Sequence, residues 1–308
     1  MTRAFVFPGQ GSQSIGMMQK LADASTLIKT VFDEASTVLD VDLWAIVTTG
    51  PEAKLNSTDI TQPIMLAAGY ATWRVWKEAG GADPVVMAGH SLGEYTALVC
   101  AGALDFKDAI KLVSARGRYM QEAVPAGTGA MAAILGLDDE AVKRVCTQAA
   151  EQEIVQAVNF NSPGQVVIAG HKHAVERAAE LAKTAGAKRA VILPVSVPSH
   201  CQLMKPAAEK LANDLAGIDI CAPSIPVINN VDVETASDVT AIRDALTRQL
   251  FQPVRWVETI QRMATDGVNV ITECGPGKVL LGLNKRIDKS LEHAAIVDAE
   301  SLHAQLNS

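Results

Sequence analysis

The pentapeptide at positions 89–93, with the sequence GHSLG, carries the clearest chemical signal in the chain. It fits the pattern G-x-S-x-G, in which a serine occupies a sharp turn between a buried strand and a helix. The apolar segment Pro84–Ala88 precedes this turn, and Glu94–Cys100 reads as a helix. In that setting the hydroxyl of Ser91 projects as a nucleophile, and the N–H of Leu92 points at a developing oxyanion. An ordinary flexible turn is the alternative, but the flanking strand and helix favour the nucleophile.

A serine nucleophile needs a base, and the chain contains six histidines. Five of them adjoin the nucleophile, open a predicted helix or lie near the polar C-terminus: His90, His171, His173, His293 and His303. The sixth, His200, follows an apolar strand and precedes a helix, so it lies at a strand end, where α/β folds place their sites. A histidine in a loop is more often structural than catalytic, but elimination favours His200 as the base.

No acidic residue stands out as the third member of a triad. Typical α/β-hydrolases have the chain order Ser, then Asp or Glu, then a late His. Here more than a hundred residues follow His200, and no acid motif is evident between it and Ser91. We therefore expect a group other than a carboxylate to orient the base. The same observation disfavours a plain esterase.

One arginine falls on the apolar side of the helix predicted over Asp105–Ala123. Arg116 is seven residues after Ala109 and shares its stripe, which also contains Met120. A buried guanidinium needs an anionic partner. Two interpretations stay open: a structural ion pair with an internal Asp or Glu, or a substrate carboxylate held by both arms of the guanidinium fork. In the second case a neutral acyl group would leave Arg116 unpaired, which would make the site selective.

The elements around these residues predict an α/β fold. Ala4–Phe7 is a short apolar strand that runs into the turn Pro8–Gly11, and Pro84–Ala88 is a second buried strand. Five later segments return to this alternation of strands and helices: Met204–Leu215, Pro226–Val231, Ala241–Met263, Val268–Glu273 and Lys278–Ile287. The pattern predicts an α/β-hydrolase-like large domain with a mainly parallel sheet covered on both faces. We assign residues 1–124 and 196–308 to this catalytic domain.

The middle of the chain has a different pattern. Predicted strands and helices follow one another there in the order βαββαβ, which is typical of a ferredoxin-like unit. These segments are Gly129–Leu137, a helix capped by Asp138 and running to Ala150, Val155–Asn159, Gln165–Ala169, His173–Ala185 and Arg189–Val195. We therefore predict an inserted ferredoxin-like domain at residues 125–195.

Composition narrows the function classes. Of the 308 residues, 48% are hydrophobic and 20% are charged, so the chain can bury a substantial core. A net charge of −7 argues against general nucleic-acid binding, which needs basic surface. We find no signal peptide and no run of about 18 apolar residues. We therefore expect a cytoplasmic protein that does not bind membranes or nucleic acid.

The cysteines and the remaining motifs give no indication of a metal or a nucleotide. The chain has five cysteines, an odd number without CxxC spacing, which favours reduced thiols in the cytoplasm over a zinc site. Gly9-Gln10-Gly11 begins like a dinucleotide fingerprint, but Ser14 stands where the third glycine belongs. We expect no metal site.

Eight short motifs occur along nearly the whole chain. They are Phe7–Gln13 (FPGQGSQ), Thr61–Pro63 (TQP), Gly89–Tyr95 (GHSLGEY), Arg116–Gly117 (RG), Gly127–Met131 (GTGAM), Asn161–Gln165 (NSPGQ), Pro198–His200 (PSH) and Glu273–Gly277 (ECGPG). In these residues and in their order the chain resembles the malonyl-CoA:acyl carrier protein transacylases of bacterial fatty-acid synthesis. The motifs are jointly specific for that family.

The resemblance implies roles for the reacting residues. Ser91 is similar to the family's nucleophile and His200 to its base. The backbone N–H groups of Gln10 and Leu92 match the oxyanion hole. In this family a backbone carbonyl orients the histidine, and Gln249 occupies the matching position. This would account for the missing triad acid.

The resemblance also implies a substrate site. Arg116 matches the arginine that binds the malonyl carboxylate, with Gln62 nearby in the pocket. The sequence departs from the family pattern at Cys274, where Val or Ile is common, away from the chemistry.

The implied reaction moves a malonyl group from malonyl-CoA to the phosphopantetheine thiol of acyl carrier protein, by a ping-pong mechanism with an ester on Ser91. It supplies fatty-acid biosynthesis and uses malonyl-CoA as a substrate, without a cofactor. We expect a monomer whose partners are malonyl-CoA and acyl carrier protein. Basic residues are candidates for contact with the acidic carrier: Lys188, Arg189, Lys285 and Arg286. Two alternatives stay open, a serine thioesterase or esterase of the α/β-hydrolase type and a non-catalytic subunit that binds the carrier protein.

Overall fold

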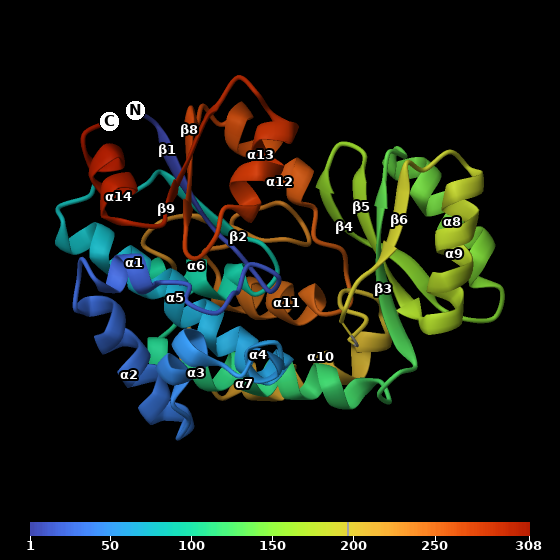
Figure 1. Ribbon diagram of the computed structural model, residues 1–308, viewed down its shortest axis with the longest axis horizontal. Helices are drawn as coiled ribbons and strands as arrows, with labels where there is room; N and C mark the ends of the chain where they lie inside the picture. Colours follow the sequence, from blue (N-terminus) through green and yellow to red (C-terminus); the bar gives the residue numbers. More distant parts are fainter. Residues whose placement is uncertain (196) are drawn as a thin grey trace.

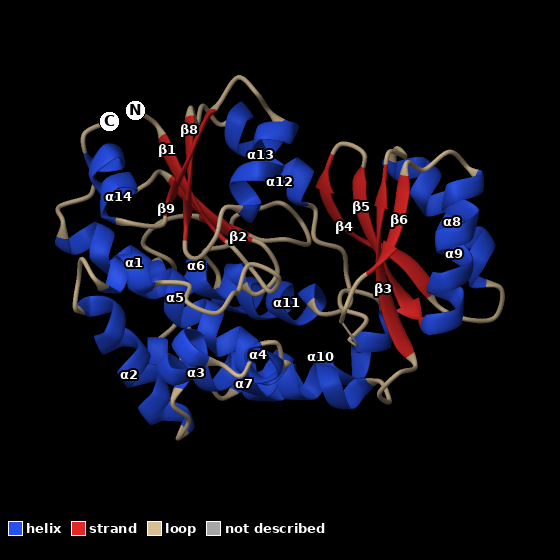
Figure 2. Ribbon diagram, in the orientation of Figure 1, coloured by secondary structure: helices blue, strands red, loops and turns tan. Residues whose placement is uncertain are grey.

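The computed structural model describes residues 1–195 and 197–308, and its strands form two separate sheets (Figures 1 and 2). The larger sheet has five strands in the order β7-β2-β1-β8-β9, and every pairing in it is parallel. Its strands are β1 (Arg3–Phe7), β2 (Val86–Gly89), β7 (Val227–Ile228), β8 (Val270–Cys274) and β9 (Glu292–Ile296). The mainly parallel sheet expected from the alternation of strands and helices is confirmed.

Helices cover both faces of the parallel sheet. Alternate side chains of a strand point to opposite faces, and in β1 both sets are buried. Phe5 and Phe7 pack in the core that includes α5 (Thr58–Glu78), and Phe5 contacts Trp73 and Trp76 edge to face. Ala4 and Val6 pack in the core on the other face, which includes α12 (Trp256–Thr265) and α13 (Val279–Ile287). Burial on both faces explains why β1 and β2 are short, largely apolar runs.

The remaining helices of this part include three close to predicted segments, at Gly93–Cys100, Phe106–Ala123 and Lys205–Ala216, whereas the helices before residue 58 and after residue 298 were not predicted. The full set is α1 (Gln19–Ala22), α2 (Leu27–Leu39), α3 (Leu43–Thr49), α4 (Glu52–Leu55), α6 (Gly93–Cys100), α7 (Phe106–Ala123), α10 (Lys205–Ala216), α11 (Val239–Gln249) and α14 (Ala299–Leu306), with a 3-10 turn at Gln202–Met204. Asp105 caps α7 by accepting hydrogen bonds from two backbone N–H groups. The segment Ala241–Met263 is divided between α11 and α12, because Pro253 in the gap has no N–H to continue a helix.

The second sheet has four antiparallel strands in the order β4-β5-β3-β6. These are β3 (Gly129–Leu135), β4 (Val155–Ser162), β5 (Gln165–His171) and β6 (Arg189–Ile192). With α8 (Asp139–Ala150) and α9 (Lys172–Thr184), the chain order is the predicted βαββαβ, and the strand order is that of a ferredoxin-like sheet. Figure 1 shows α8 and α9 on the outer face, away from the parallel sheet. Asp138 caps α8 as expected.

The other face of the antiparallel sheet turns toward the rest of the chain. Met131, Val167 and Ala169 pack there with Cys201, which comes directly after His200. We propose that the chain divides into a catalytic domain, residues 1–124 and 196–308, and an inserted domain, residues 125–195. The boundary residue Ser196 lies outside the described residues.

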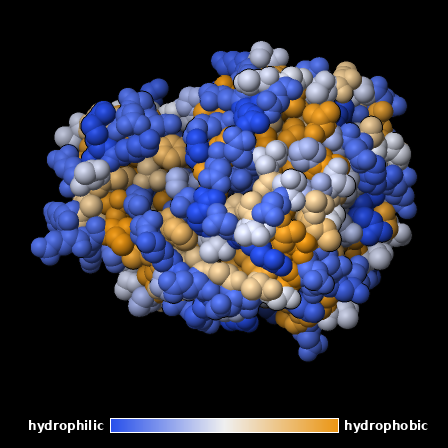
Figure 3. Space-filling model, turned by 180° about the vertical axis from the view of Figure 1, so that it is seen from behind, coloured by the Kyte–Doolittle hydropathy of each residue, from blue (hydrophilic) through white to orange (hydrophobic). Residues whose placement is uncertain are grey.

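The surface seen from behind is mostly hydrophilic, with small apolar patches between the polar side chains (Figure 3). Within residues 1–195 and 197–308, none of the helices combines the length and the apolar character that crossing a bilayer requires.

Candidate active site

A strained turn at the carboxyl end of β2 presents Ser91. The backbone of Ser91 is left-handed, with φ of 51°, and α6 begins two residues later. The glycines on either side are required by space. A Cβ on Gly89 would lie 1.8 Å from the carbonyl carbon of Gly93, and one on Gly93 would lie 2.0 Å from the oxygen of Phe7. The turn therefore has the strand-to-helix geometry that the G-x-S-x-G pattern predicts.

Asn230 supports this turn from the neighbouring strand. It lies just after β7 and is fully buried. Its side-chain Oδ1 accepts a hydrogen bond from the Ser91 N–H at 2.7 Å, and its Nδ2 donates to the Gly89 oxygen at 2.7 Å. One amide side chain thus satisfies backbone groups on both sides of His90. This compensates for the ladder bonds that a left-handed residue cannot make.

Ser91, His200 and Gln249 form a hydrogen-bonded chain. The Ser91 Oγ is 2.8 Å from His200 Nε2, and His200 Nδ1 is 2.7 Å from the backbone oxygen of Gln249. The backbone N–H of His200 also donates a hydrogen bond to the backbone oxygen of Leu250 at 3.0 Å. The C-terminus of α11 therefore fixes both the ring and the backbone of His200. A carbonyl only accepts, so Nδ1 carries the proton and the lone pair of Nε2 faces the serine hydroxyl.

The surroundings of His200 keep its imidazole neutral. Burial and then the nearby Arg116 cation lower the pKa of His200 to about 3, although the hydrogen bond to Gln249 acts in the opposite direction. His200 as a whole residue is only 3% exposed. A neutral imidazole with a free Nε2 lone pair is the form that can take a proton from a serine hydroxyl.

Arg116 reaches the same serine from α7, and its side chain is buried as its place on the apolar stripe predicts. It donates from Nη1 to Gln62 Oε1 at 2.8 Å and from Nη2 to Gln249 Oε1 at 3.0 Å. Its Nη2 is also 3.4 Å from the Ser91 Oγ. Both close partners are neutral amides.

Arg116 has no carboxylate partner in the described part of the chain. None of the ion pairs within residues 1–195 and 197–308 includes it. Its Nε is also buried without a hydrogen-bond partner there. Burial lowers the pKa of the Arg116 guanidinium, and the smaller opposing effects of Tyr95 and then Glu94 offset it only in part. The structural ion pair left open by the sequence is therefore not formed, and the site holds a cation that an anionic ligand would neutralise.

Two backbone donors beside the nucleophile are free. The turn after β1 packs against the turn at Ser91, since a Cβ on Gly9 would lie 2.4 Å from the His90 oxygen and 3.7 Å from the Leu92 nitrogen. Among the described residues, neither the Gln10 N–H nor the Leu92 N–H has a hydrogen-bond acceptor. Two unused N–H groups from turns that pack against each other at the serine suit an oxyanion.

Glu94 lies beneath these residues in the first turn of α6 and is 2% exposed. Its Oε2 accepts hydrogen bonds from the Asn230 N–H at 2.9 Å and from Gln249 Nε2 at 2.8 Å. Gln249 Nε2 also donates to the Ser91 oxygen at 3.0 Å. The Glu94 carboxylate and the Ser91 carbonyl oxygen together thus fix which end of the Gln249 amide faces Arg116. Burial raises the pKa of Glu94 to about 7, while its hydrogen bonds and Arg116 oppose that shift.

The other histidines do not reach Ser91. The side chain of His90 points away and its Nε2 is 2.8 Å from Asn161 Oδ1 on β4, so it joins the turn to the antiparallel sheet. The other four lie elsewhere: His171, His173, His293 and His303. Within the described residues, no three His, Cys, Asp or Glu side chains gather in a way that could hold a metal ion.

Comparison with known proteins agrees with this geometry. The acyl transferase domain family matches residues 4–301. A "malonyl CoA-acyl carrier protein transacylase" of Haemophilus influenzae is 60% identical over 302 residues, which cover 98% of this chain and 97% of that protein. The chain belongs to the malonyl CoA-acyl carrier protein transacylase family. The resemblance inferred from the eight motifs is therefore confirmed.

Solved structures of this transacylase family have the same fold. An acyl carrier protein S-malonyltransferase from Vibrio cholerae is 60% identical, with a TM-score of 0.97 and 99% of each chain covered. A malonyl-transacylase in complex with its type II PKS acyl-carrier protein is 58% identical, with a TM-score of 0.99 over 100% of this chain and 99% of that one.

The structure brings together all the residues that the sequence proposes for the transacylase site and adds two. Asn230 and Glu94 hold the turn and the Gln249 amide, and neither was predicted. A signal was available for each. Asn230 follows an apolar strand at the carboxyl edge of a parallel sheet, where α/β proteins place functional groups. Glu94 is the one charged residue in helix α6, which is buried along its whole length.

Proposed function

We propose that the chain transfers a malonyl group from malonyl-CoA to the phosphopantetheine thiol of an acyl carrier protein, through an ester on Ser91, and so supplies fatty-acid biosynthesis. The observation that carries this proposal is the buried Arg116 guanidinium. It lies 3.4 Å from the Ser91 Oγ and is held by two neutral amide oxygens. A carboxylate on the acyl group would complete its coordination, whereas a neutral acyl group would leave it unpaired.

In the first half-reaction, His200 Nε2 takes the proton of Ser91 as the Oγ attacks the thioester carbonyl. The N–H groups of Gln10 and Leu92 stabilise the oxyanion, and the Gln249 carbonyl stabilises the imidazolium. The C–S bond then breaks, and the coenzyme A sulfur leaves with the proton from His200. The product of this step is the Ser91 malonyl ester.

The second half-reaction runs in reverse with a different thiol. The phosphopantetheine thiol gives its proton to His200 and attacks the ester carbonyl. The C–O bond breaks, and the Ser91 Oγ recovers the proton from His200. Malonyl-carrier protein leaves and the free serine is restored. Every step uses groups of this chain and of the two substrates, without a cofactor.

The carrier protein has a candidate contact region. Lys188 of the inserted domain and Arg286 of α13 lie on one hollow, which the turn Ser162–Gly164 also lines. Asp138 also lines this hollow, but the two cations outnumber its single carboxylate, which suits an acidic partner. The five cysteines are all free, which supports a reducing cytoplasmic setting.

The experiment that tests the function is intact-mass measurement after mixing the protein with malonyl-CoA. We expect a persistent malonyl adduct on Ser91 that disappears when acyl carrier protein is added. Immediate release of free malonate without an adduct would instead indicate a thioesterase. Transfer at an undiminished rate by Ser91→Ala would indicate that the chain only binds the carrier.

A second experiment tests the role of Arg116. Arg116→Ala should shift the preference from malonyl-CoA toward acetyl-CoA, measured as the ratio of kcat/KM for the two substrates. The same ratio in the variant and the unmodified protein would remove Arg116 from substrate recognition.

A further inference from the structure

Two segments that are distant from Ser91 in the sequence hold the two halves of the reacting pair. The loop after β7 supplies Asn230, which accepts the Ser91 N–H at 2.7 Å. The C-terminus of α11 supplies the Gln249 oxygen, which is 2.7 Å from His200 Nδ1. The Ser91–His200 distance therefore depends on how the loop and the helix lie relative to each other.

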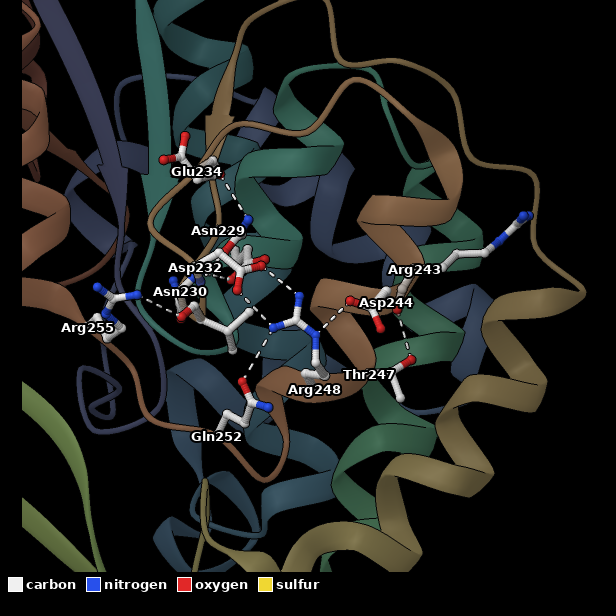
Figure 4. Close-up of polar contacts among 12 residues, drawn as sticks. Asn229, Asn230, Asp232, Glu234, Arg243, Asp244, Thr247, Arg248, Gln252 and Arg255 are labelled. Carbon is white, nitrogen blue, oxygen red and sulfur yellow. Dashed lines mark hydrogen bonds and ion pairs between the residues drawn. The ribbon is translucent and has the colours of Figure 1, made fainter.

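An ion pair joins these two segments directly. Arg248, the residue before Gln249, donates to both carboxylate oxygens of Asp232, from Nη1 at 2.9 Å and from Nη2 at 2.6 Å. Asp232 is two residues after Asn230. Figure 4 shows the guanidinium between the loop and α11, facing Asp232 on one side and Asp244 on the other. The pair thus connects the neighbours of the two positioning residues.

Two contacts other than the one with Asp232 also hold the Arg248 guanidinium in place. Arg248 Nε donates to Asp244 Oδ2 at 2.6 Å, one turn earlier on α11, and Nη1 is 3.4 Å from Gln252 Oε1. Arg248 lowers the pKa of Asp232, so the carboxylate stays charged over a wide pH range. The side chains of Arg248 and Asp232 are 26% and 43% exposed. An isolated pair so exposed contributes little to stability, but a two-point contact of a rigid fork restricts geometry as well.

The same loop has a second ion pair that does not lead to the site. Arg262 of α12 donates to Glu234 at 3.2 Å and to Asp266 at 2.7 Å. Its side chain is 36% exposed, comparable to that of Arg248. Helix α12 supplies no residue to the Ser91–His200 pair. Arg262 is therefore a matched control for an arginine that ties this loop to a helix.

We propose that the Arg248–Asp232 ion pair is a positioning device, which clamps the Asn230 loop to α11 and so keeps Ser91 and His200 at reacting distance. The inference rests on the proposed function, because its readout is malonyl transfer. Under this proposal Arg248 and Asp232 affect the rate of the chemical step, although both are partly exposed and neither contacts Ser91 or His200.

The test compares Arg248→Gln, Asp232→Ala and the double variant with Arg262→Gln. We expect the first two to lower kcat about 10-fold with KM unchanged, because they loosen the reacting geometry and leave Arg116 in place. The double variant should be no slower than the single ones, since one interaction is lost in each. Arg248→Lys, which keeps the charge without the fork, should recover part of the rate. Arg262→Gln should keep kcat within about twofold of the unmodified chain.

Thermal unfolding of every variant separates positioning from general stability. The proposal is overturned if Arg248→Gln loses no more kcat than Arg262→Gln, or if its loss follows Tm alone across the set. Adduct formation by the unmodified chain is measured first. If Ser91 is not malonylated, the proposed function is wrong. If Ser91 is malonylated and the Arg248 variants are as fast as the unmodified chain, only the proposed role of the Arg248–Asp232 ion pair is wrong.

Discussion

The carboxyl end of the parallel sheet and the antiparallel sheet are both tightly packed, but different interactions hold them. At the parallel sheet, six polar side chains around Ser91 are exposed by 3% or less: Gln62, Glu94, Arg116, His200, Asn230 and Gln249. They come from four helices and two loops, and their hydrogen bonds connect them to one another and to the turn at Ser91. Each buried polar group must be satisfied, so each restricts its neighbours.

The antiparallel sheet has an aliphatic core instead. Side chains of β3 and β5 pack with α8 and α9, and Ile168 at the centre is fully buried. Its ion pairs, such as Arg177–Glu153, lie at the surface. A main polar link to the site is the bond from Asn161 to His90. Aliphatic packing tolerates small shifts, whereas a polar network fixes directions. The difference locates the chemistry at the parallel sheet.

The largest expected effect is the loss of the base. His200→Ala should lower kcat for malonyl transfer by about 10²–10⁴-fold, because among the described residues no other base lies within hydrogen-bond distance of the Ser91 Oγ. Rapid-mix mass measurement of the Ser91 adduct isolates this step. A variant that remains folded and keeps a rate within tenfold of the unmodified chain would remove His200 from the reaction.

A substitution in the antiparallel sheet should do the opposite. Ile168→Ala removes a fully buried side chain and should cost about 2–5 kcal/mol of unfolding free energy, measured by urea titration. At temperatures where the variant is folded, kcat for malonyl transfer should stay the same. A loss of kcat as large as that of His200→Ala would mean that the two regions are not separable.

A second comparison lies within the parallel sheet, between a buried carboxyl group at the site, Glu94, and one away from it, Glu273. Burial raises the pKa of both to about 7, but Glu273 accepts from the N-terminus of α13, away from Ser91. A carboxyl group whose pKa is higher in the folded than in the unfolded state lowers the free energy of unfolding as the pH rises from about 4.5 to about 7. Above about pH 7 this decrease is complete. Glu94→Gln and Glu273→Gln should each gain stability relative to the unmodified chain between pH 5 and pH 8, by roughly 1–3 kcal/mol.

Activity then distinguishes the two carboxylates. Only Glu94 orients the Gln249 amide toward Arg116, so only Glu94→Gln should change kcat or the malonyl preference. Equal activity of both variants at pH 8 would show that the Glu94 charge has no part in the site. Unfolding by urea at several pH values and transfer assays on the same samples provide both measurements.

The sequence could predict those parts of the site that depend on local pattern. Ser91 has a five-residue motif, Arg116 stands out by helical periodicity, and His200 follows by elimination. Asn230 and Glu94 act through contacts across 139 and 136 positions, with Ser91 and with each other. Nothing in the local sequence fixes such a pairing. For the fold as well, the helices and strands that were predicted lie close to their positions in the structure. The break between α11 and α12 was missed, and the helices before α6, strand β9 and α14 were not predicted.

The smallest expected effect concerns the coupling between the substrate cation site and the base. Arg116 is the second cause, after burial, that lowers the pKa of His200. Removing the cation in Arg116→Ala should raise the pKa of His200 toward its ordinary value. A base with a higher pKa becomes protonated earlier on acidification, so the acid limb of kcat/KM for acetyl-CoA should lie at higher pH in the variant than in the unmodified chain. The shift should be about one pH unit or less, because burial remains the larger cause.

Arg118→Ala, on the polar side of the same helix, is the control and should leave the acid limb of kcat/KM in place. Superimposable limbs for Arg116→Ala and the unmodified chain would mean that the cation acts on substrate binding alone; a shifted limb would mean that a malonyl carboxylate, by neutralising Arg116, also makes His200 a stronger base.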